Sequence, residues 1–544
     1  MNDLKKLLFI AFGIFACGAT AWAQEPHTNF PAEVKAEDAT ITQVGHATMT
    51  VETKIVVDSL TRRTDTLRTV TDIEWDTPAG TAKRRNAELN RYNPNGSGFY
   101  DEGHSSWYDI YYYNFNYPSI NAEGQPVLLS AMACMPDEDC DYINNVIIGC
   151  HVTITSNKEC PSEYVRTGAG GKASDVGMLI NHASSGMVFH SLQSNLAYYN
   201  LVIMPDYEGY GITRSHAHPY LYQELTARQV VDATRYGIAL YNTSPTINEI
   251  RHDFRSGWRS ISVGYSQGGS VALATHRFIE QNGLTDELQF AGSVCGDGPY
   301  NPVATLMYYV KQYDDRVAMS MPVVLPLILK GMCDWNPYMK NHKVSDYLSS
   351  DFLATGILDW LTEKEKTTDD ITDAWLHYYL SHDDEYVTPD GEDLLLNLGY
   401  VLKPAGLDYF QNLYNTNANT YTSAAGVPLP TQRGLMEDLH FALASNNLTK
   451  GWVPQHTIFL YHSFDDSVVP EVNRQSAYNS FPDWVIKLHA SGTWQFDHVG
   501  TGRQFYLGTE EAEAIRVLSK APVHQTTATV ANIKSNMDPN SLDN

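Results

Sequence analysis

Short apolar runs recur through the middle of this 544-residue chain, and segments with helical spacing separate them. Within one such segment, residues 224–241, the apolar side chains recur at the period of a helix. Buried strands that alternate with helices predict a mainly parallel α/β sheet. The strands of this sheet are expected at residues 145–149, 201–204, 261–263 and 290–294.

The pattern changes on both sides of this core and predicts how the chain is organised. Residues 24–105 are polar and threonine-rich with alternating stretches, which predicts a β-rich N-terminal extension before a core that starts at residue 106. After residue 302 the strand pattern stops, and apolar helical segments predict a helical cap over residues 303–450. The core resumes over residues 451–520, with strands expected at 457–461 and 484–488, and a polar tail follows over 521–544.

The first residues have the features of an export signal. Lys5 and Lys6 precede an apolar run, and A-W-A ends at Ala23, so residues 1–23 are expected to be a signal peptide. The chain is then secreted or periplasmic, with lipid attachment at Cys17 as an alternative. The longest later apolar run, residues 317–329, is too short to span a bilayer, so no stable membrane span is expected.

Charge and cysteine content narrow the possible partners. The formal net charge of −26 argues against nucleic acid and anionic membranes as partners. Six cysteines follow the signal, an even number that suggests disulfides in an exported protein. Cys134 with Cys140, and Cys150 with Cys160, are the expected pairs. No C-x-x-C pair indicates zinc, and no metal site is expected.

The main chemical motif lies after the strand at 261–263. The sequence G-Y-S-Q-G at 264–268 leads into a helix of small and apolar residues over 270–279. A strand, G-x-S-x-G and a helix form the pattern of a nucleophile elbow, in which a tight turn exposes the serine hydroxyl. Gly269 would permit closer packing of the turn. Ser266 is therefore the candidate nucleophile, and a purely structural turn is the alternative.

A serine nucleophile needs a base and an acid that orients it, and in enzymes with this elbow the acid and then the histidine follow the serine. Asp465 and Asp466 come directly after the strand at 457–461, and Asp466 fits better because it stands four residues before Pro470. His498 lies in the loop after the next strand and is the candidate base, with His489 in reserve.

The oxyanion of the reaction needs two backbone donors. The amide of Gln267 follows from the elbow, and the amide of Asp206, after the strand at 201–204, is the second candidate, with His151 as runner-up. His216 and His218 form an H-x-H pair without a third metal ligand, so they are expected on a surface loop. His151 and His462, at strand ends, are interpreted as structural.

Three stretches together resemble the secretory lipase (lipase A-like) branch of the α/β-hydrolases: P-D-Y-E-G at 205–209, G-Y-S-Q-G-G at 264–269 and D-S-V-V-P at 466–470. A-G-S at 291–293, leading to Pro299, is similar to the strand end before the cap in that group. The resemblance covers roughly residues 200–506. It implies an α/β-hydrolase core with a helical lid and activity on acyl esters. It also supports Ser266, Asp466 and His498 as the triad, and the amides of Asp206 and Gln267 as the oxyanion hole.

The expected function is hydrolysis of carboxylic esters, from small molecules or lipids, through an acyl-enzyme and without a cofactor. A serine peptidase of the prolyl-oligopeptidase type is one alternative, but the extension of about 80 residues is too short for the β-propeller such enzymes carry. A non-catalytic binding protein on a hydrolase scaffold is the other, and the filled triad positions argue against it.

Overall fold

The computed structural model describes residues 31–523 with several gaps. The expected signal peptide, Cys17 and the tail beyond Val523 lie outside the described residues. The gaps are residues 58–63, 78–79, 86–98, 101–103, 138–139, 141, 165–174, 184–188, 192–193, 197–198, 313–322, 383–397, 422–426, 464–465, 467, 484, 492–504, 506–508 and 522.

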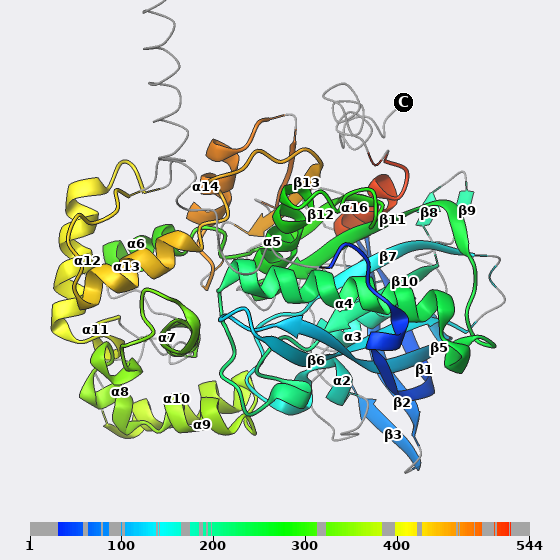
Figure 1. Cartoon of the computed structure of the whole chain (residues 1–544), viewed down its shortest axis with the longest axis horizontal. Coiled ribbons are helices and arrows are strands. Elements are labelled where there is room, and N and C mark those ends of the chain that lie inside the picture. Colours follow the sequence, from blue (N-terminus) through cyan, green and yellow to red (C-terminus); the bar gives the residue numbers. More distant parts are fainter. Residues whose placement is uncertain are drawn as a thin grey trace, which may run out of the picture.

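A twelve-stranded sheet runs through the described residues (Figure 1). Six neighbouring strands are parallel, and their buried interiors explain why the sequence shows them as apolar runs. The predicted parallel α/β core is therefore confirmed, and each expected core strand is present. In spatial order the six are β14 (Ile486–Ser491), β13 (Thr457–Ser463), β12 (Phe290–Gly296), β11 (Phe254–Tyr265), β7 (Ile143–Cys150) and β10 (Asn200–Pro205).

Antiparallel strands continue the same sheet beyond β10. They are β6 (Pro126–Pro136), β5 (His104–Ile120), β1 (Thr40–Val57), β2 (Thr64–Thr77) and β3 (Gly80–Arg85), and β4 (Phe99–Tyr100) pairs with β1. Strand β1 pairs with β5 from Thr40 opposite Asn116 to Thr53 opposite His104. The N-terminal extension is β-rich as expected, but it is part of the core sheet, and the boundary expected at 105/106 falls inside β5.

Helices cover both faces of the sheet. On one face, α4 (Gln223–Thr243), α5 (Gln267–Gln281) and α14 (Val472–Ser480) contribute to the buried apolar clusters. On the other face lie α2 (Pro161–Tyr164), α3 (Asp175–Ile180) and α16 (Thr509–Leu518). Shorter elements are the 3-10 turns Ala36–Asp38, Asn157–Glu159, Asn181–Ala183, Gly211–Thr213, Pro245–Ile247 and Val344–Asp346, and the hairpin of β8 (Phe189–Ser191) and β9 (Ser194–Leu196).

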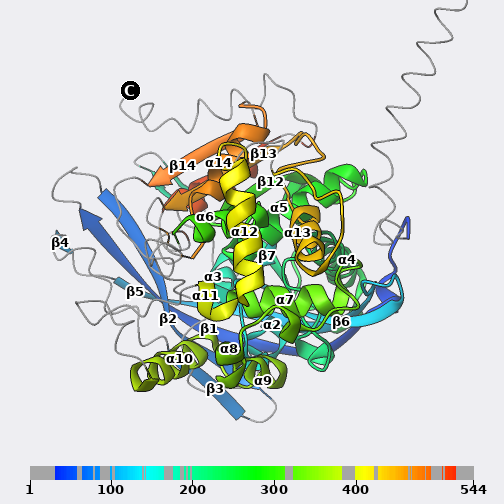
Figure 2. The ribbon, with the colours of Figure 1, turned by 90° about the vertical axis from the view of Figure 1, so that its left-hand side faces the viewer.

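The predicted helical cap is inserted between β12 and β13 and lies at one end of the molecule (Figures 1 and 2). Its helices share one buried apolar cluster, which Tyr220 and Leu221 of the core join. Among the described residues, no helix has the length and apolar character to cross a membrane. The cap helices are α6 (Pro302–Gln312), α7 (Val324–Trp335), α8 (Ser350–Ala354), α9 (Ile357–Glu363), α10 (Thr368–His382), α11 (Leu398–Val401), α12 (Pro404–Asn417) and α13 (Leu435–Ser445).

Lys364, at the end of α9, connects the cap to the core through hydrogen bonds. Its side chain is almost fully buried, and Nζ donates to the backbone carbonyls of Gly209, Arg214 and His216 in the loop after β10. Lys364 itself has a φ of 56°, a left-handed conformation that usually favours glycine or asparagine. Burial lowers the pKa of this ammonium to about 8, so it is mainly charged at neutral pH.

The expected disulfides are not present in the structure: none of the six buried cysteines from Cys134 to Cys333 is joined to another. Cys134, on β6, packs in the cluster on the α3 face of the sheet, while Cys140, beyond the end of β6, packs in the cluster on the α4 face. Cys150 lies in the cluster under α5, whereas Cys160 packs with Ile154 and Tyr210. The sheet and its side chains therefore separate the cysteines of each expected pair.

Candidate active site

The strand, turn and helix expected around Ser266 are present. Strand β11 ends at Tyr265, α5 begins at Gln267, and Ser266 between them has φ 56° and ψ −123°. A residue other than glycine in this conformation is strained by about 1–3 kcal/mol, and such strain is concentrated at functional sites. The Ser266 amide donates to the carbonyl of Gly296 on β12 at 2.9 Å, which helps to hold the turn.

Glycines make this turn possible. A Cβ at Gly264 would lie 2.3 Å from the carbonyl oxygen of Gly268, and one at Gly268 would lie 2.0 Å from that of Cys150. A Cβ at Gly269 would lie 2.2 Å from the carbonyl oxygen of Gly296. All three contacts are with backbone atoms, so no larger residue fits without moving a strand. The expectation that Gly269 permits close packing is thus confirmed.

Ser266 lines an apolar pocket between the core and the cap. Its lining is mostly apolar with few polar groups, as in most small-molecule sites. The cap contributes most of the wall, and Pro299 and the loops at 220–221 and 468–469 contribute the rest. The lining residues are Tyr220, Leu221, Pro299, Pro302, Thr305, Leu306, Tyr309, Val324, Leu325, Ile328, Leu398, Leu443, Val468 and Val469.

Asp466 lies buried in the loop after β13. Its Oδ1 accepts from the backbone amides of Val468 and Val469 at 2.8 and 2.7 Å, which hold the carboxylate in place. The hydroxyl of Tyr309, from the pocket wall, donates to the Val468 carbonyl at 2.7 Å. This places the acid loop against the same pocket that Ser266 enters. Asp465 lies outside the described residues.

The candidate base, His498, also lies outside the described residues, so its role stays a prediction. The reserve candidate, His489, is within β14, where it pairs in register with Tyr461 of β13. It is therefore part of the sheet.

A buried acid beside this site, Asp297, was missed at the level of sequence. Asp297 follows β12, accepts from the Tyr265 hydroxyl at 2.8 Å, and lies 2.7 Å from Nδ1 of His462. The pKa of Asp297 is raised to about 6, because burial and the nearby carboxylate of Asp466 raise it by more than His462 lowers it. Burial lowers the pKa of His462, but the carboxylate of Asp297 outweighs this and raises it. In the sequence, the signal that could have identified Asp297 as a candidate acid was its position at the end of a strand, next to β13.

The assignment of an oxyanion donor to the Asp206 amide does not fit the structure. That amide donates to the carbonyl of Ser130 on β6 at 3.0 Å, and the Asp206 side chain accepts from Ser130 and Ser162. Asp206 is thus a buried acid with a structural role, and burial raises the pKa of its carboxyl group. Strand β7, which is followed by the runner-up His151, lies next to β11 in the sheet and is better placed for this role.

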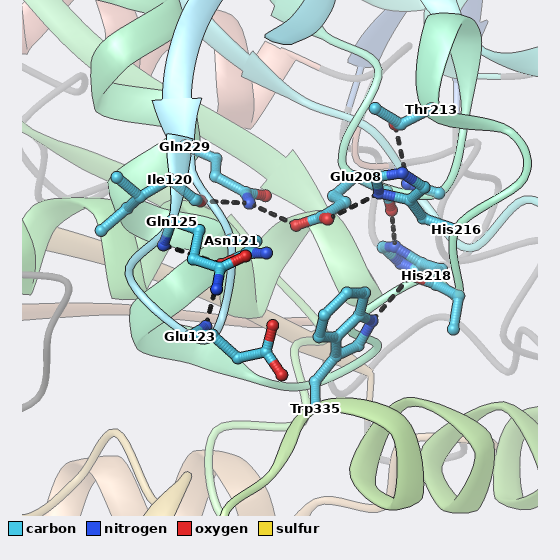
Figure 3. A network of polar contacts seen from close by, with 12 residues as sticks. Ile120, Asn121, Glu123, Gln125, Glu208, Thr213, His216, His218, Gln229 and Trp335 are labelled. Carbon is cyan, nitrogen blue, oxygen red and sulfur yellow. Dashed lines mark hydrogen bonds and ion pairs between the residues drawn. The ribbon is translucent and has the colours of Figure 1, made fainter. Parts of the chain in front are cut away.

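Gln267 occupies the first position of α5, where a helix amide has no acceptor within its own helix. Its side-chain Nε2 lies 2.7 Å from Nε2 of His218. His218 is 4% exposed, so the expectation that the H-x-H pair sits on a surface loop is wrong for this residue. His216 is partly exposed and lies 3.0 Å from the buried carboxylate of Glu208 (Figure 3).

Two groups of side chains in the described residues have the composition of metal ligands: His276, Glu280 and His456, and the more exposed His46, Asp109 and Asp137. In the first, Glu280 Oε1 already accepts from both imidazoles and from two backbone amides. The second nitrogen of His456 contacts the carbonyl of Val523 at 2.6 Å. This carboxylate is engaged in a hydrogen-bond network away from Ser266.

No protein-family model and no curated protein matches the sequence. Solved structures do match the fold. The chain is similar to the rice cell wall degrading esterase LipA from Xanthomonas oryzae, with 20% identity, a TM-score of 0.53, and 76% of this chain and 91% of that chain covered. It is also similar to Candida antarctica lipase A in its closed state, with 13% identity, a TM-score of 0.45, and 72% and 73% of the two chains covered. With this strand order, its elbow and its inserted helices, the chain has the α/β-hydrolase fold with a helical cap.

Proposed function

We propose that this protein is a serine hydrolase that cleaves carboxylic esters with an apolar acyl group. The observation that carries the proposal is the position of Ser266: a strained turn holds it at the N-terminus of α5, and it lines an apolar pocket. A strained serine at the mouth of a pocket is costly for the fold, and nucleophilic catalysis is the role that explains the cost.

In the proposed reaction, Ser266 Oγ attacks the ester carbonyl and its proton passes to His498. Asp466 orients the imidazole and stabilises its positive charge. The alcohol leaves with the proton from His498, and an acyl-enzyme remains. Water then attacks the acyl-enzyme, the histidine again takes the proton, and the acid is released as Ser266 recovers its proton.

The negative oxygen of each tetrahedral intermediate needs donors. The proposal assigns the Gln267 amide, which points out of the positive end of α5, and a second backbone amide from the loop at 151–152 after β7. The adjacency of β7 and β11 supports this second donor, since both strands end at the same edge of the sheet.

The pocket favours an ester with a hydrocarbon acyl chain over a peptide. Its wall consists almost entirely of apolar side chains from α6, α7 and the two loops. A peptide would bring polar amides that need hydrogen-bond partners, and burying them without partners costs about 1–3 kcal/mol each. The similarity to LipA from Xanthomonas oryzae, a rice cell wall degrading esterase, supports an ester as the substrate.

A fluorophosphonate probe tests the nucleophile directly. The wild-type protein should be labelled once, and peptide mapping should place the label on Ser266. The Ser266→Ala variant should fold normally and take no label, while Ser445→Ala, on cap helix α13, should be labelled like the wild type. Absence of label on a folded wild-type protein, or a label elsewhere, would overturn the proposal and favour a binding protein on a hydrolase scaffold.

A further inference from the structure

The segment 216–221 connects three parts of the proposed site. His218 contacts Gln267 at the elbow, and Tyr220 and Leu221 line the apolar pocket. At its start, the carbonyl of Ala217 accepts from Nε1 of Trp335, at the end of cap helix α7, at 2.8 Å (Figure 3). The segment therefore lies between the cap and the residue that follows the nucleophile.

Two contacts determine where the proton of His218 lies. Nδ1 is 2.8 Å from the carbonyl oxygen of Glu208, which can only accept, so Nδ1 carries the hydrogen. Burial lowers the pKa of His218 to about 3, so the ring is neutral at pH 7 and Nε2 has a lone pair. Nε2 must then accept, and the amide nitrogen of Gln267 at 2.7 Å donates to it. A flipped Gln267 amide would require a charged ring, which burial opposes.

The surroundings keep His218 in one place. Its ring is parallel to that of Tyr207, with an interplanar angle of 6° and centroids 5.9 Å apart, and Tyr207 stacks on His151 at 4.0 Å. The Tyr207 hydroxyl donates to the His151 carbonyl at 3.3 Å. One stack of three rings therefore joins Gln267 to the loop after β7, on both sides of the proposed oxyanion hole.

Glu208 also helps to hold His218 in position. Its carboxylate is fully buried between Nε2 of Gln229 at 2.7 Å and Nδ1 of His216 at 3.0 Å, and its carbonyl holds His218 (Figure 3). On the cap side, a Cβ at Gly331 of α7 would lie 2.8 Å from the His218 carbonyl oxygen, so the cap helix touches this segment directly.

We propose that His218 is a positioning residue for the oxyanion hole: by accepting a hydrogen bond from the Gln267 side chain, it fixes the Gln267 backbone amide where the oxyanion forms. Cap helix α7, which both lines the pocket and holds this segment, is thereby linked to the reaction centre. The inference rests on the proposed function, because it needs Ser266 as the nucleophile.

The expected effect follows from oxyanion-hole energetics. Complete loss of one donor lowers kcat by about 10²–10³-fold, and a misplaced group costs up to about 10². Loss of the hydrogen bond between His218 and Gln267 leaves the Gln267 amide present but less well fixed, so kcat should fall by about tenfold to 10²-fold. KM should change by less than about twofold, because the oxyanion contact strengthens only in the transition state.

Four variants and one control test this effect on a chromogenic butyryl ester. His218→Asn keeps a donor for the Glu208 carbonyl but loses the acceptor for Gln267, so kcat should fall. His218→Gln reaches far enough to offer its Oε1 to Gln267 and should recover most of kcat. Gln267→Ala removes the other partner and should resemble His218→Asn, and the double variant should be no slower than either single one. His440→Asn, a buried neutral histidine of α13, serves as the matched control and should keep the wild-type kcat.

Labelling of the wild type by a fluorophosphonate separates the two proposals. If Ser266 is not labelled, the proposed function fails, and the inference fails with it. If Ser266 is labelled but His218→Asn and Gln267→Ala keep the wild-type kcat, only the inference is overturned. Additive losses in the double variant, or an equal loss in His440→Asn, would also overturn it. Should His218→Asn not fold, Gln267→Ala alone carries the test.

Discussion

Replacing Ile328 by tryptophan should shorten the acyl chain that the protein accepts. Ile328 lies on cap helix α7 and lines the apolar pocket with Ser266. Each methylene moved from water into such a pocket contributes about 0.8 kcal/mol, a factor of about four. In the wild type, a butyryl ester should exceed an acetyl ester by up to about 15-fold in kcat/KM, and an octanoyl ester by up to about 3,000-fold if all six extra methylenes are buried.

The indole of Ile328→Trp would occupy part of this space. If it displaces the four outermost methylenes of an octanoyl chain, about 3.2 kcal/mol is lost, and kcat/KM for that ester falls by about 200-fold. The acetyl ester does not reach so far and should be hydrolysed at the wild-type rate. Ile212→Trp is the matched control, because Ile212 is 48% exposed and is not part of the pocket wall.

The assay is a series of p-nitrophenyl esters from acetyl to octanoyl, with a peptide anilide for comparison. An equal loss for acetyl and octanoyl esters in Ile328→Trp would mean that the variant damages the reaction centre and that α7 does not bind the chain. A wild-type profile that peaks at acetyl would refute the lipase-like specificity. Efficient cleavage of the anilide would favour a peptidase.

Three further predictions concern single residues. Ser266→Ala should lower ester hydrolysis by at least about 10³-fold with unchanged thermal unfolding, and a loss below tenfold would exclude Ser266 as the nucleophile. Asp466→Asn should lower kcat by up to about 10⁴-fold, because the imidazole loses its orienting acid, whereas Asp465→Asn should be mild; the reverse order would move the acid to Asp465. Burial alone would raise the pKa of Glu280, but His276 and His456 outweigh it and lower this pKa to about 2 from its ordinary 4.5. The charged Glu280 therefore stabilises the fold above about pH 4.5 by about 3 kcal/mol, and this contribution is lost as the pH falls toward 2. Chemical denaturation of Glu280→Gln against the wild type should show a difference that shrinks over this window, and a difference independent of pH would contradict the reasoning.

Local patterns in the sequence were sufficient for the elbow and the acid loop. The conformation of Ser266 depends on glycines within three residues, and the Asp466 carboxylate is bound by amides two and three residues later. These interactions are short-range, so the sequence motif and the structure coincide. The buried parallel strands were also predictable, since burial on both faces leaves continuous apolar runs.

Contacts between residues that are far apart in the sequence explain what the sequence did not predict. The Asp206 amide was assigned to an oxyanion hole, but its acceptor, the Ser130 carbonyl, comes from β6, 76 residues earlier. His218 was expected on a surface loop because its H-x-H pair has no third metal ligand in the sequence, but helix α7, which begins more than 100 residues later, packs against its segment. The cysteine pairs were chosen for their closeness in sequence, which says nothing about the face of the sheet on which each side chain lies.

The buried ammonium of Lys364 determines where the cap can move. Three backbone carbonyls of the loop after β10 accept hydrogen bonds from Nζ. They surround the ammonium as oxygen ligands surround a bound monovalent cation, but this cation is covalently attached to the cap. Withdrawing the ammonium would leave the three carbonyls without their hydrogen-bond donor, and the charge would have to be solvated by water in place of them. Lifting the cap from the core as one body would break all three hydrogen bonds, whereas a movement of α6 and α7 relative to the end of α9 would keep them.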